Sequence, residues 1–208
     1  RAVRARVPSA RIMGVVKADA YGHGAVPVAK ALVGQGCDAL AVAAVEEGIE
    51  LREAGVRIPV LVLGASTPDA ACAAVQYNLG QAVFDEKTLA AMQREALRFD
   101  TVAHAHLKID SGMARIGVRS EAELDALLAS WKKCPNVKLE GVFTHFADAV
   151  GNPSFTSEQN SFFKEAVGRI RATGARPVAH AAASGAIFSD VRLHYDFVRP
   201  GIALYGAS

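Results

Sequence analysis

The chain has 208 residues, 51% hydrophobic and 21% charged, and this composition excludes a disordered, collagen-like or disulfide-scaffold protein. We expect one domain over residues 1–208. The 23 Lys and Arg residues nearly balance the 21 Asp and Glu residues, and the net charge of +2 favours small-molecule partners over nucleic acid or a membrane surface.

The cysteines and the N-terminus indicate the compartment. Cys37, Cys72 and Cys134 are odd in number, far apart and never spaced as Cys-x-x-Cys, which favours free thiols over disulfides or structural zinc. No apolar run reaches the roughly 18 residues that cross a bilayer, and no secretory signal pattern is present. We therefore expect a cytoplasmic protein.

Short apolar runs alternate with amphipathic segments along the chain, which is typical of repeated strand-helix units with a parallel sheet. One such segment follows Ser120, which we expect to cap a helix with acids in its first turn. Most of the runs are apolar throughout or nearly so, as expected of parallel strands covered on both faces. The eight expected strands are residues 12–16, 39–43, 60–63, 81–84, 103–109, 139–143, 177–181 and 197–203.

Eight strands favour a closed (β/α)8 TIM barrel, although a doubly wound open sheet would have a similar local pattern. The chain is short for this fold, whose usual size is about 250 residues. Residues 1–6 resemble the end of a basic helix, residue 1 is not methionine, and no closing helix follows the eighth strand. We therefore expect a fragment of a longer chain.

The active site of such a barrel lies at the C-terminal ends of its strands. Polar residues occur at five of these ends: Lys17, Lys108, His145, Ser184 and Arg199. A lysine that ends a buried strand is desolvated, which lowers its pKa and favours Schiff-base chemistry. A single lysine there is more often a solvated charge, but five convergent polar ends favour an active site.

Two loops are candidates for binding a phosphate. Ser184 and the pair Gly201 and Ile202 follow the seventh and eighth strands, where barrels often hold phosphate groups. Tyr21 lies in a glycine-containing loop at residues 17–24 that allows close approach of a ligand. The alternative is that Ser184 caps a helix and Gly201 permits a tight bend.

Arg115 lies in the polar segment that follows the fifth strand. Its guanidinium could hold a substrate carboxylate in a bidentate fork, which suits an amino-acid substrate. The alternative is a surface ion pair with an acid such as Asp110.

Four motifs stand out in the chain: KADAYGHG at 17–24, LKIDSGMARIG at 107–117, THFA at 144–147 and VRPGIALYG at 198–206. In this order and with comparable spacing, they together resemble bacterial alanine racemase over nearly the whole chain. The resemblance implies a fold-type III enzyme that uses pyridoxal 5'-phosphate to interconvert L- and D-alanine through an external Schiff base, supplying D-alanine for peptidoglycan.

The resemblance implies a role for each motif residue. Lys17 matches the lysine that holds the cofactor and then, once displaced by the substrate, exchanges the α-proton on one face. Arg199 matches the arginine facing the pyridine ring, and His145 matches the histidine that contacts it. Because arginine keeps its proton, the ring stays a weaker electron sink, which favours racemisation over transamination. The positions matching phosphate-binding residues are Tyr21, Ser184, Gly201 and Ile202.

Two further positions are matched near the substrate. Arg115 resembles the arginine beside the cofactor's phenolic oxygen and the substrate carboxylate. Lys108 resembles a lysine that is carbamylated in many family members, where the new anion holds the arginine. The alternative for Lys108 is an unmodified amine paired with Asp110.

The sequence departs from the family pattern in two ways. Ala183 stands where an asparagine commonly precedes the phosphate-binding serine. The family's second, β-rich domain, which supplies the other catalytic residue, a tyrosine from the partner subunit of a homodimer, is not among these residues. We expect the isolated chain to bind the cofactor but to racemise poorly.

Other functions remain open at this stage. Alanine, serine and broad-specificity racemases share the motifs, and a Schiff-base lysine aldolase would use the same barrel without the cofactor. A metal-dependent hydrolase is a weaker alternative, based on His104 and His106. His104 lies four residues before the strand end, below the expected site, so we interpret both histidines as structural and expect no metal.

Overall fold

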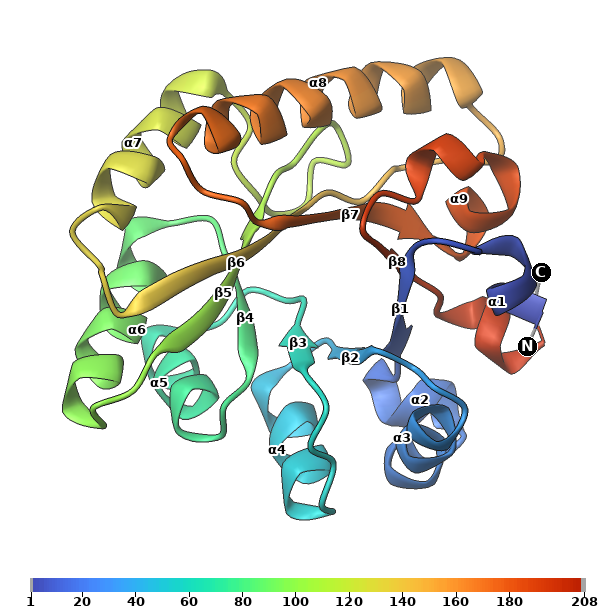
Figure 1. Cartoon of the computed structure of the whole chain (residues 1–208), viewed down its shortest axis with the longest axis horizontal. Coiled ribbons are helices and arrows are strands. Elements are labelled where there is room, and N and C mark those ends of the chain that lie inside the picture. Colours follow the sequence, from blue (N-terminus) through green and yellow to red (C-terminus); the bar gives the residue numbers. More distant parts are fainter. Residues whose placement is uncertain (1, 207–208) are drawn as a thin grey trace.

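The computed structural model describes residues 2–206, in which eight parallel strands close into a barrel in the order β1 to β8, with helices outside (Figure 1). The (β/α)8 prediction is therefore confirmed. The strands are β1 (Arg11–Val15), β2 (Ala39–Val42), β3 (Val60–Val62), β4 (Gly80–Val83), β5 (Ala103–Lys108), β6 (Val137–Phe143), β7 (Val178–Ala183) and β8 (Phe197–Arg199).

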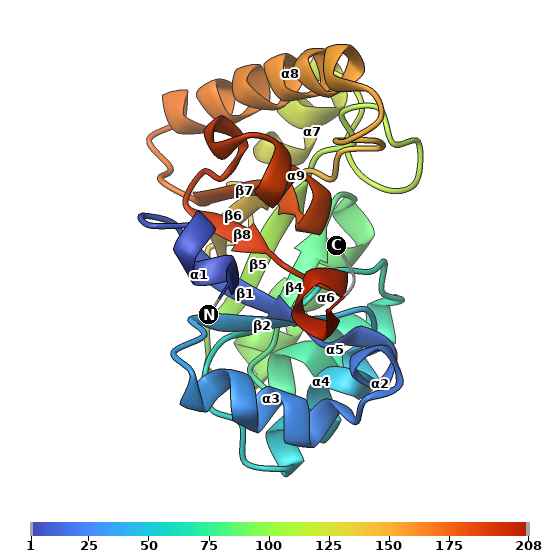
Figure 2. The same ribbon diagram turned by 90° about the vertical axis from the view of Figure 1, so that its right-hand side faces the viewer.

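Helices follow the strands and pack on their outer face. Figure 2 shows α1 next to α9, near the seam where β1 pairs with β8. The helical segments are α1 (Ala2–Arg6), α2 (Lys17–Gly22), α3 (Ala25–Gly34), α4 (Val45–Glu53), α5 (Pro68–Gln76), α6 (Glu86–Arg98), α7 (Glu121–Trp131), α8 (Pro153–Ala172), α9 (Ser184–Ser189), and the 3-10 turns η1 (Val191–Leu193) and η2 (Ile202–Tyr205). In the described part of the chain, no helix combines the length and apolar character needed to span a membrane.

The helix boundaries follow local capping chemistry. Ser120 caps α7 as expected, because its hydroxyl oxygen accepts from the Glu123 amide at 3.2 Å. Asp85 caps α6 in the same way, through the Thr88 amide at 2.8 Å. The cysteines are free, as expected.

The last strand is shorter than expected. The apolar run at 197–203 predicted one strand, but β8 ends at Arg199 and η2 begins at Ile202. Pro200 has no amide hydrogen to donate to a strand ladder, and the Pro200 carbonyl accepts instead from Val15 N at 2.9 Å. This early end places residues 201 and 202 in a turn at the mouth of the barrel.

The barrel interior is apolar on one side and polar on the other. Residues of β1, β2, β3 and β8 pack there as one apolar group: Met13, Val15, Ala39, Ala41, Leu61 and Phe197. β5, β7 and the last residue of β8 place buried polar side chains in the same interior: His106, Lys108, His180 and Arg199. Buried polar side chains therefore extend through the centre of the barrel from one end toward the other.

Candidate active site

A cavity of about 540 Å³ lies at the C-terminal ends of the strands. Its lining contains four cationic side chains and no aspartate or glutamate. A cavity with this charge attracts anionic ligands. All nine residues that the sequence singled out line it: Lys17, Tyr21, Lys108, Arg115, His145, Ser184, Arg199, Gly201 and Ile202.

Lys17 begins a left-handed turn rather than an ordinary helix. Residues 18–21 have φ between 51° and 57°, although none of them is glycine. Such a backbone costs roughly 1–2 kcal/mol per residue, so other contacts must hold it. The Asp19 carboxylate supplies one, accepting from Ala25 N at 2.7 Å. The turn brings Lys17 and Tyr21 to the same cavity.

Glu47 supplies the other contacts that hold this turn. Its Oε1 accepts from Ala18 N at 2.6 Å, next to Lys17. Its Oε2 accepts from Ala43 N at 2.6 Å and from Ala44 N at 3.1 Å, at the end of β2. One carboxylate therefore ties the loop after β1 to the loop after β2 and positions Lys17.

Tyr21 and Gly201 meet at the edge of the cavity. A Cβ atom on Gly201 would lie 2.5 Å from the Tyr21 hydroxyl oxygen, so only glycine fits here without displacing the tyrosine. The Tyr21 ring also contacts the Tyr205 ring, with centroids 5.0 Å apart. Tyr205 is itself fixed by a hydrogen bond from its hydroxyl to Val15 O at 3.1 Å.

Ser184 connects the loops after β7 and β8. Its hydroxyl oxygen accepts from Gly201 N at 3.0 Å and from Ala203 N at 3.2 Å. The alternative that Ser184 caps α9 is wrong, because Ala183 occupies the cap position. Since the oxygen accepts twice, its hydrogen is free to donate into the cavity. The Gly201 amide is already engaged, whereas the Ile202 amide has no acceptor among the described residues.

Arg199 is 2% exposed and is held by neighbours on two strands. Its Nη1 donates to His180 Nδ1 at 2.9 Å. Its Nη2 donates to Thr144 O at 2.7 Å and Ala181 O at 2.9 Å, with His145 Nδ1 at 3.4 Å. Burial lowers the pKa of Arg199 to about 9, so the guanidinium remains protonated at pH 7.

His145 is held neutral by its surroundings. Burial, followed by the nearby charges of Arg199, Arg115, Lys108 and Lys17, lowers the pKa of His145 to about 3. A neutral imidazole can accept from Arg199 through Nδ1 and keep a hydrogen on Nε2. The contact with Arg199 agrees with the position expected for His145.

Lys108 is 3% exposed and donates to Ile109 O at 2.6 Å. Burial, and secondarily the charge of Arg199, lowers the pKa of Lys108 to about 7. The two alternative ion pairs with Asp110 do not form within residues 2–206. Asp110 binds Arg119 Nε at 3.2 Å and accepts from backbone amides, including that of Arg115.

Three supporting residues were missed by the sequence reasoning. Glu47 positions Lys17, His180 binds Arg199, and the Phe143 ring stacks on His180 with centroids 4.9 Å apart. The alternation of inward positions could have identified His180, which lies on an inward face of β7. No sequence pattern marks Glu47 in this way, because its carboxylate contacts backbone amides.

The two histidines of β5 lie away from this cavity. His106 Nδ1 is 2.8 Å from His180 Nε2, and His104 Nδ1 is 3.1 Å from Glu140 Oε2. Both histidines line a second cavity at the N-terminal end of the barrel. Within residues 2–206, no group of three His, Cys, Asp or Glu side chains is placed to hold a metal ion.

Comparisons with known proteins agree with this geometry. The family model for the N-terminal domain of alanine racemase matches residues 1–208. The alanine racemase of Symbiobacterium thermophilum is 44% identical over 99% of this chain and 55% of its own length, and that of Halothermothrix orenii is 43% identical over 94% and 52%.

Solved structures show the same relationship. Alanine racemase from Clostridium difficile superposes with a TM-score of 0.94 at 36% identity, over 99% of this chain and 55% of its own. Alanine racemase from Bacillus anthracis with bound L-Ala-P gives 0.93 at 35% identity, over 100% and 54%. The chain therefore spans about half the length of the relatives it matches. It belongs to the alanine racemase family, whose N-terminal domain it represents.

Proposed function

We propose that the protein is a pyridoxal-phosphate-dependent racemase that interconverts L- and D-alanine. The observation that carries the proposal is that the barrel brings all nine expected residues to one cation-lined cavity at the C-terminal ends of its strands. A substrate carboxylate and a cofactor phosphate are both anions, and both need the donors that this cavity offers.

The donors at one edge of the cavity fit a phosphate group. The hydroxyl hydrogen of Ser184, the amide of Ile202 and the hydroxyl of Tyr21 are available there, and Gly201 leaves room for close approach. Ala183 offers no side-chain donor in place of the family asparagine, so these neighbours would carry more of the binding. Lys17 would hold the cofactor covalently through its amine.

The cofactor, when bound, supplies an electron sink that stabilises the negative charge left on the substrate α-carbon. Arg199 offers only N–H donors and keeps its proton at pH 7, so it would bind the ring nitrogen without protonating it. His145 and the carbonyl of Thr144 hold the guanidinium in place for this contact.

Once the amino group of the substrate has replaced it on the cofactor, the freed Lys17 amine would act as the base that takes and returns the α-proton on one face of the substrate. Arg115 would hold the substrate carboxylate, which keeps the α-carbon within reach of the Lys17 amine. A carbamate on Lys108 would add an anion that orients Arg115 and offsets part of the cationic charge around it.

The relatives support an amino-acid substrate. One related structure contains L-Ala-P and another is a complex with cycloserine, both of them amino-acid-like molecules. The proposal includes a cytoplasmic homodimer that supplies D-alanine for peptidoglycan. It also includes a second catalytic residue, outside residues 1–208, for the other face of the substrate.

Exchange of the alanine α-proton in D₂O tests this proposal. With pyridoxal phosphate added, the chain should exchange the α-proton of one enantiomer faster than the other, with little racemisation, because Lys17 reaches one face. The variant Lys17→Arg keeps the charge and should abolish exchange, whereas Lys30→Arg, on α3, should not. Equal exchange by the Lys17→Arg variant would exclude Lys17 as the base.

A further inference from the structure

A second cavity, of about 310 Å³, lies at the N-terminal end of the barrel, opposite the candidate active site. We call it the basal cavity, and Arg11, Leu61, His104, His106, Glu140 and Phe197 are among its lining residues. We propose that it binds a small oxyanion, a carboxylate or a phosphate, held by Arg11 and by the Nε2 hydrogen of His106.

The protonation of His106 follows from a hydrogen-bonded chain that starts at Arg199. A guanidinium can only donate, so His180 Nδ1, 2.9 Å from Arg199 Nη1, must be an acceptor without a hydrogen. His180 then carries its hydrogen on Nε2, which donates to His106 Nδ1 at 2.8 Å. His106 in turn must carry its hydrogen on Nε2.

The Nε2 hydrogen of His106 has no acceptor among the described residues, although the side chain is only 6% exposed. Nε2 is not one of the fully buried unpartnered atoms and keeps some exposure, so its hydrogen is available to a ligand that offers an oxygen lone pair. Because His106 lines the basal cavity, that ligand would sit there.

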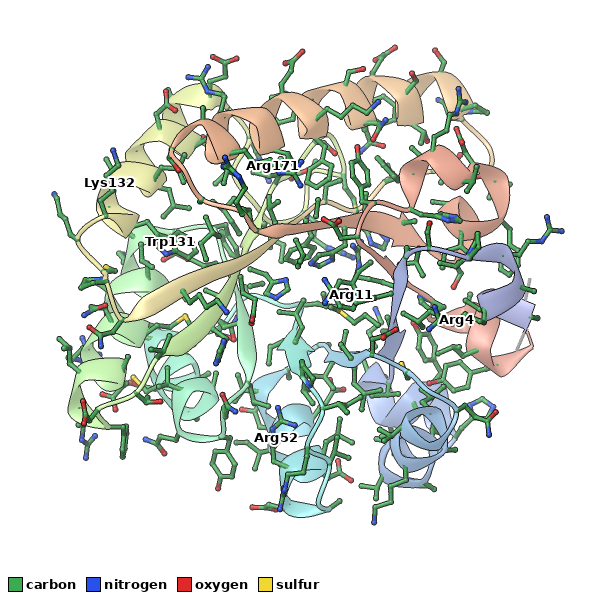
Figure 3. All side chains as sticks on the ribbon, in the orientation of Figure 1. Arg4, Arg11, Arg52, Trp131, Lys132 and Arg171 are labelled. Atoms are coloured by element: carbon green, nitrogen blue, oxygen red, sulfur yellow. The ribbon has the colours of Figure 1, made fainter. Side chains whose placement is uncertain are left out.

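Arg11 supplies the charge that selects an anion. Its guanidinium lies over the Phe197 ring, 4.0 Å from the centroid, and extends from β1 toward the barrel interior (Figure 3). Within residues 2–206 it forms no ion pair. The carboxylate in the lining, Glu140, is paired with Lys138 at 3.3 Å, and its Oε2 lies 3.1 Å from His104 Nδ1.

The other cations of the cavity keep its potential positive. Arg52 and Arg57 also line it, and Arg52 donates to carbonyl oxygens, among them Ile58 O at 2.8 Å and Asn78 O at 2.9 Å, rather than to a carboxylate. One paired glutamate therefore faces three arginines, which favours binding of an anion over binding of a cation.

NMR of the ¹⁵N-histidine-labelled protein tests the proposal with two probes, acetate and inorganic phosphate. The free protein should show hydrogen on Nε2 of both His180 and His106. Titration to roughly 50 mM, which fills a site of millimolar Kd, should shift His106 Nε2 in a saturable way. A saturable shift with acetate alone identifies a carboxylate site, and one with phosphate alone identifies a phosphate site. The signals of His145 separately report phosphate that binds in the candidate active site, at the opposite end of the barrel.

Two arginine variants provide the matched comparison. Arg11→Gln should weaken binding at His106 at least about tenfold, because a charge-assisted contact is lost. Arg98→Gln removes the same charge from another arginine that lies over a phenylalanine ring, Phe99, and should leave binding unchanged. Hydrogen on His106 Nδ1, no saturable shift with either probe, or equal binding by Arg11→Gln would each overturn the proposal.

Discussion

Arg199 and His180 form a hydrogen-bonded pair inside the barrel, with Arg199 Nη1 2.9 Å from His180 Nδ1. Both side chains are almost fully buried, and the His180 ring stacks on Phe143 with an interplanar angle of 2°. His180 therefore satisfies one donor of a buried cation and fixes its direction. It acts as a positioning residue for Arg199.

Removing the acceptor of this pair should reduce stability. His180→Phe keeps a flat ring against Phe143 but leaves Arg199 Nη1 without its acceptor, so the free energy of unfolding should fall by about 1–3 kcal/mol. His180→Asn can place an oxygen near the position of Nδ1 and should keep the Arg199 contact. Denaturant unfolding of both variants, with the ¹⁵N signals of Arg199, checks this. Unchanged Arg199 signals in His180→Phe would contradict the assigned role.

Stability should fall in mild acid because of buried histidines. Burial lowers the pKa of His106 from 6.5 to about 4 and that of His145 to about 3. As the pH falls below 6.5, the unfolded chain binds protons that the folded chain does not. Each such histidine therefore removes about 1.4 kcal/mol of stability per pH unit until its folded pKa is reached.

Denaturant unfolding between pH 6.5 and 4.5 measures this slope. Histidines contribute across this window, whereas carboxylates whose pKa values are lowered in the folded protein, such as Glu140, contribute mainly at its acid end. His145→Gln should make the slope shallower by about 1.4 kcal/mol per pH unit, whatever its effect on stability at pH 7. An identical slope in wild type and variant would show that His145 is protonated in the folded protein.

The left-handed turn after β1 should tolerate glycine better than alanine. Ala18→Gly relieves roughly 1–2 kcal/mol of backbone strain and loses part of this gain through the greater freedom of the unfolded chain, so stability should rise by about 0.5–1 kcal/mol. Ala31→Gly, an exposed position in α3, should lower stability by about the same amount. Thermal unfolding measures the stability of both variants. A loss of stability in Ala18→Gly would contradict the inferred backbone strain at Ala18.

Lys108 should react with carbon dioxide. Its lowered pKa of about 7 makes much of the amine neutral near pH 7.5. The neutral amine adds CO₂ and releases a proton, and the resulting carbamate anion is stabilised by Arg199 and Arg115 nearby. Native mass spectrometry should show the mass of one CO₂, lost on acidification and absent from Lys108→Met. The same added mass in that variant would place the modification elsewhere.

The fold could be predicted from the sequence because most strands are short, largely apolar runs, separated by segments of recognisable helical pattern. The end of β8 could not, because the segment after Pro200 is as apolar as the strand itself. The positive φ angles of Ala18 and Ala20 could not be predicted either, since alanine rarely adopts positive φ. The carboxylates of Asp19, within the turn, and of Glu47, on α4, hold that conformation.

Some residues of the candidate site could likewise be predicted from the sequence, and others could not. Residues at strand ends, such as Lys17 and Lys108, were predictable because a parallel barrel brings these ends together. The partners that hold them were not, because Glu47 acts through backbone amides and its position in α4 resembles any solvated helix face. Interior pairs such as Arg199 and His180 depend on strand register, which the sequence alone does not reveal.

The most direct test of the account is to identify the lysine that binds pyridoxal phosphate. The protein with added cofactor should turn yellow, and borohydride reduction followed by peptide mapping should place the label on Lys17. Lys17→Ala should lose both the colour and the label, while Lys30→Ala should keep them. A label on Lys108 or elsewhere, with Lys17 unmodified, would contradict the proposed cofactor site.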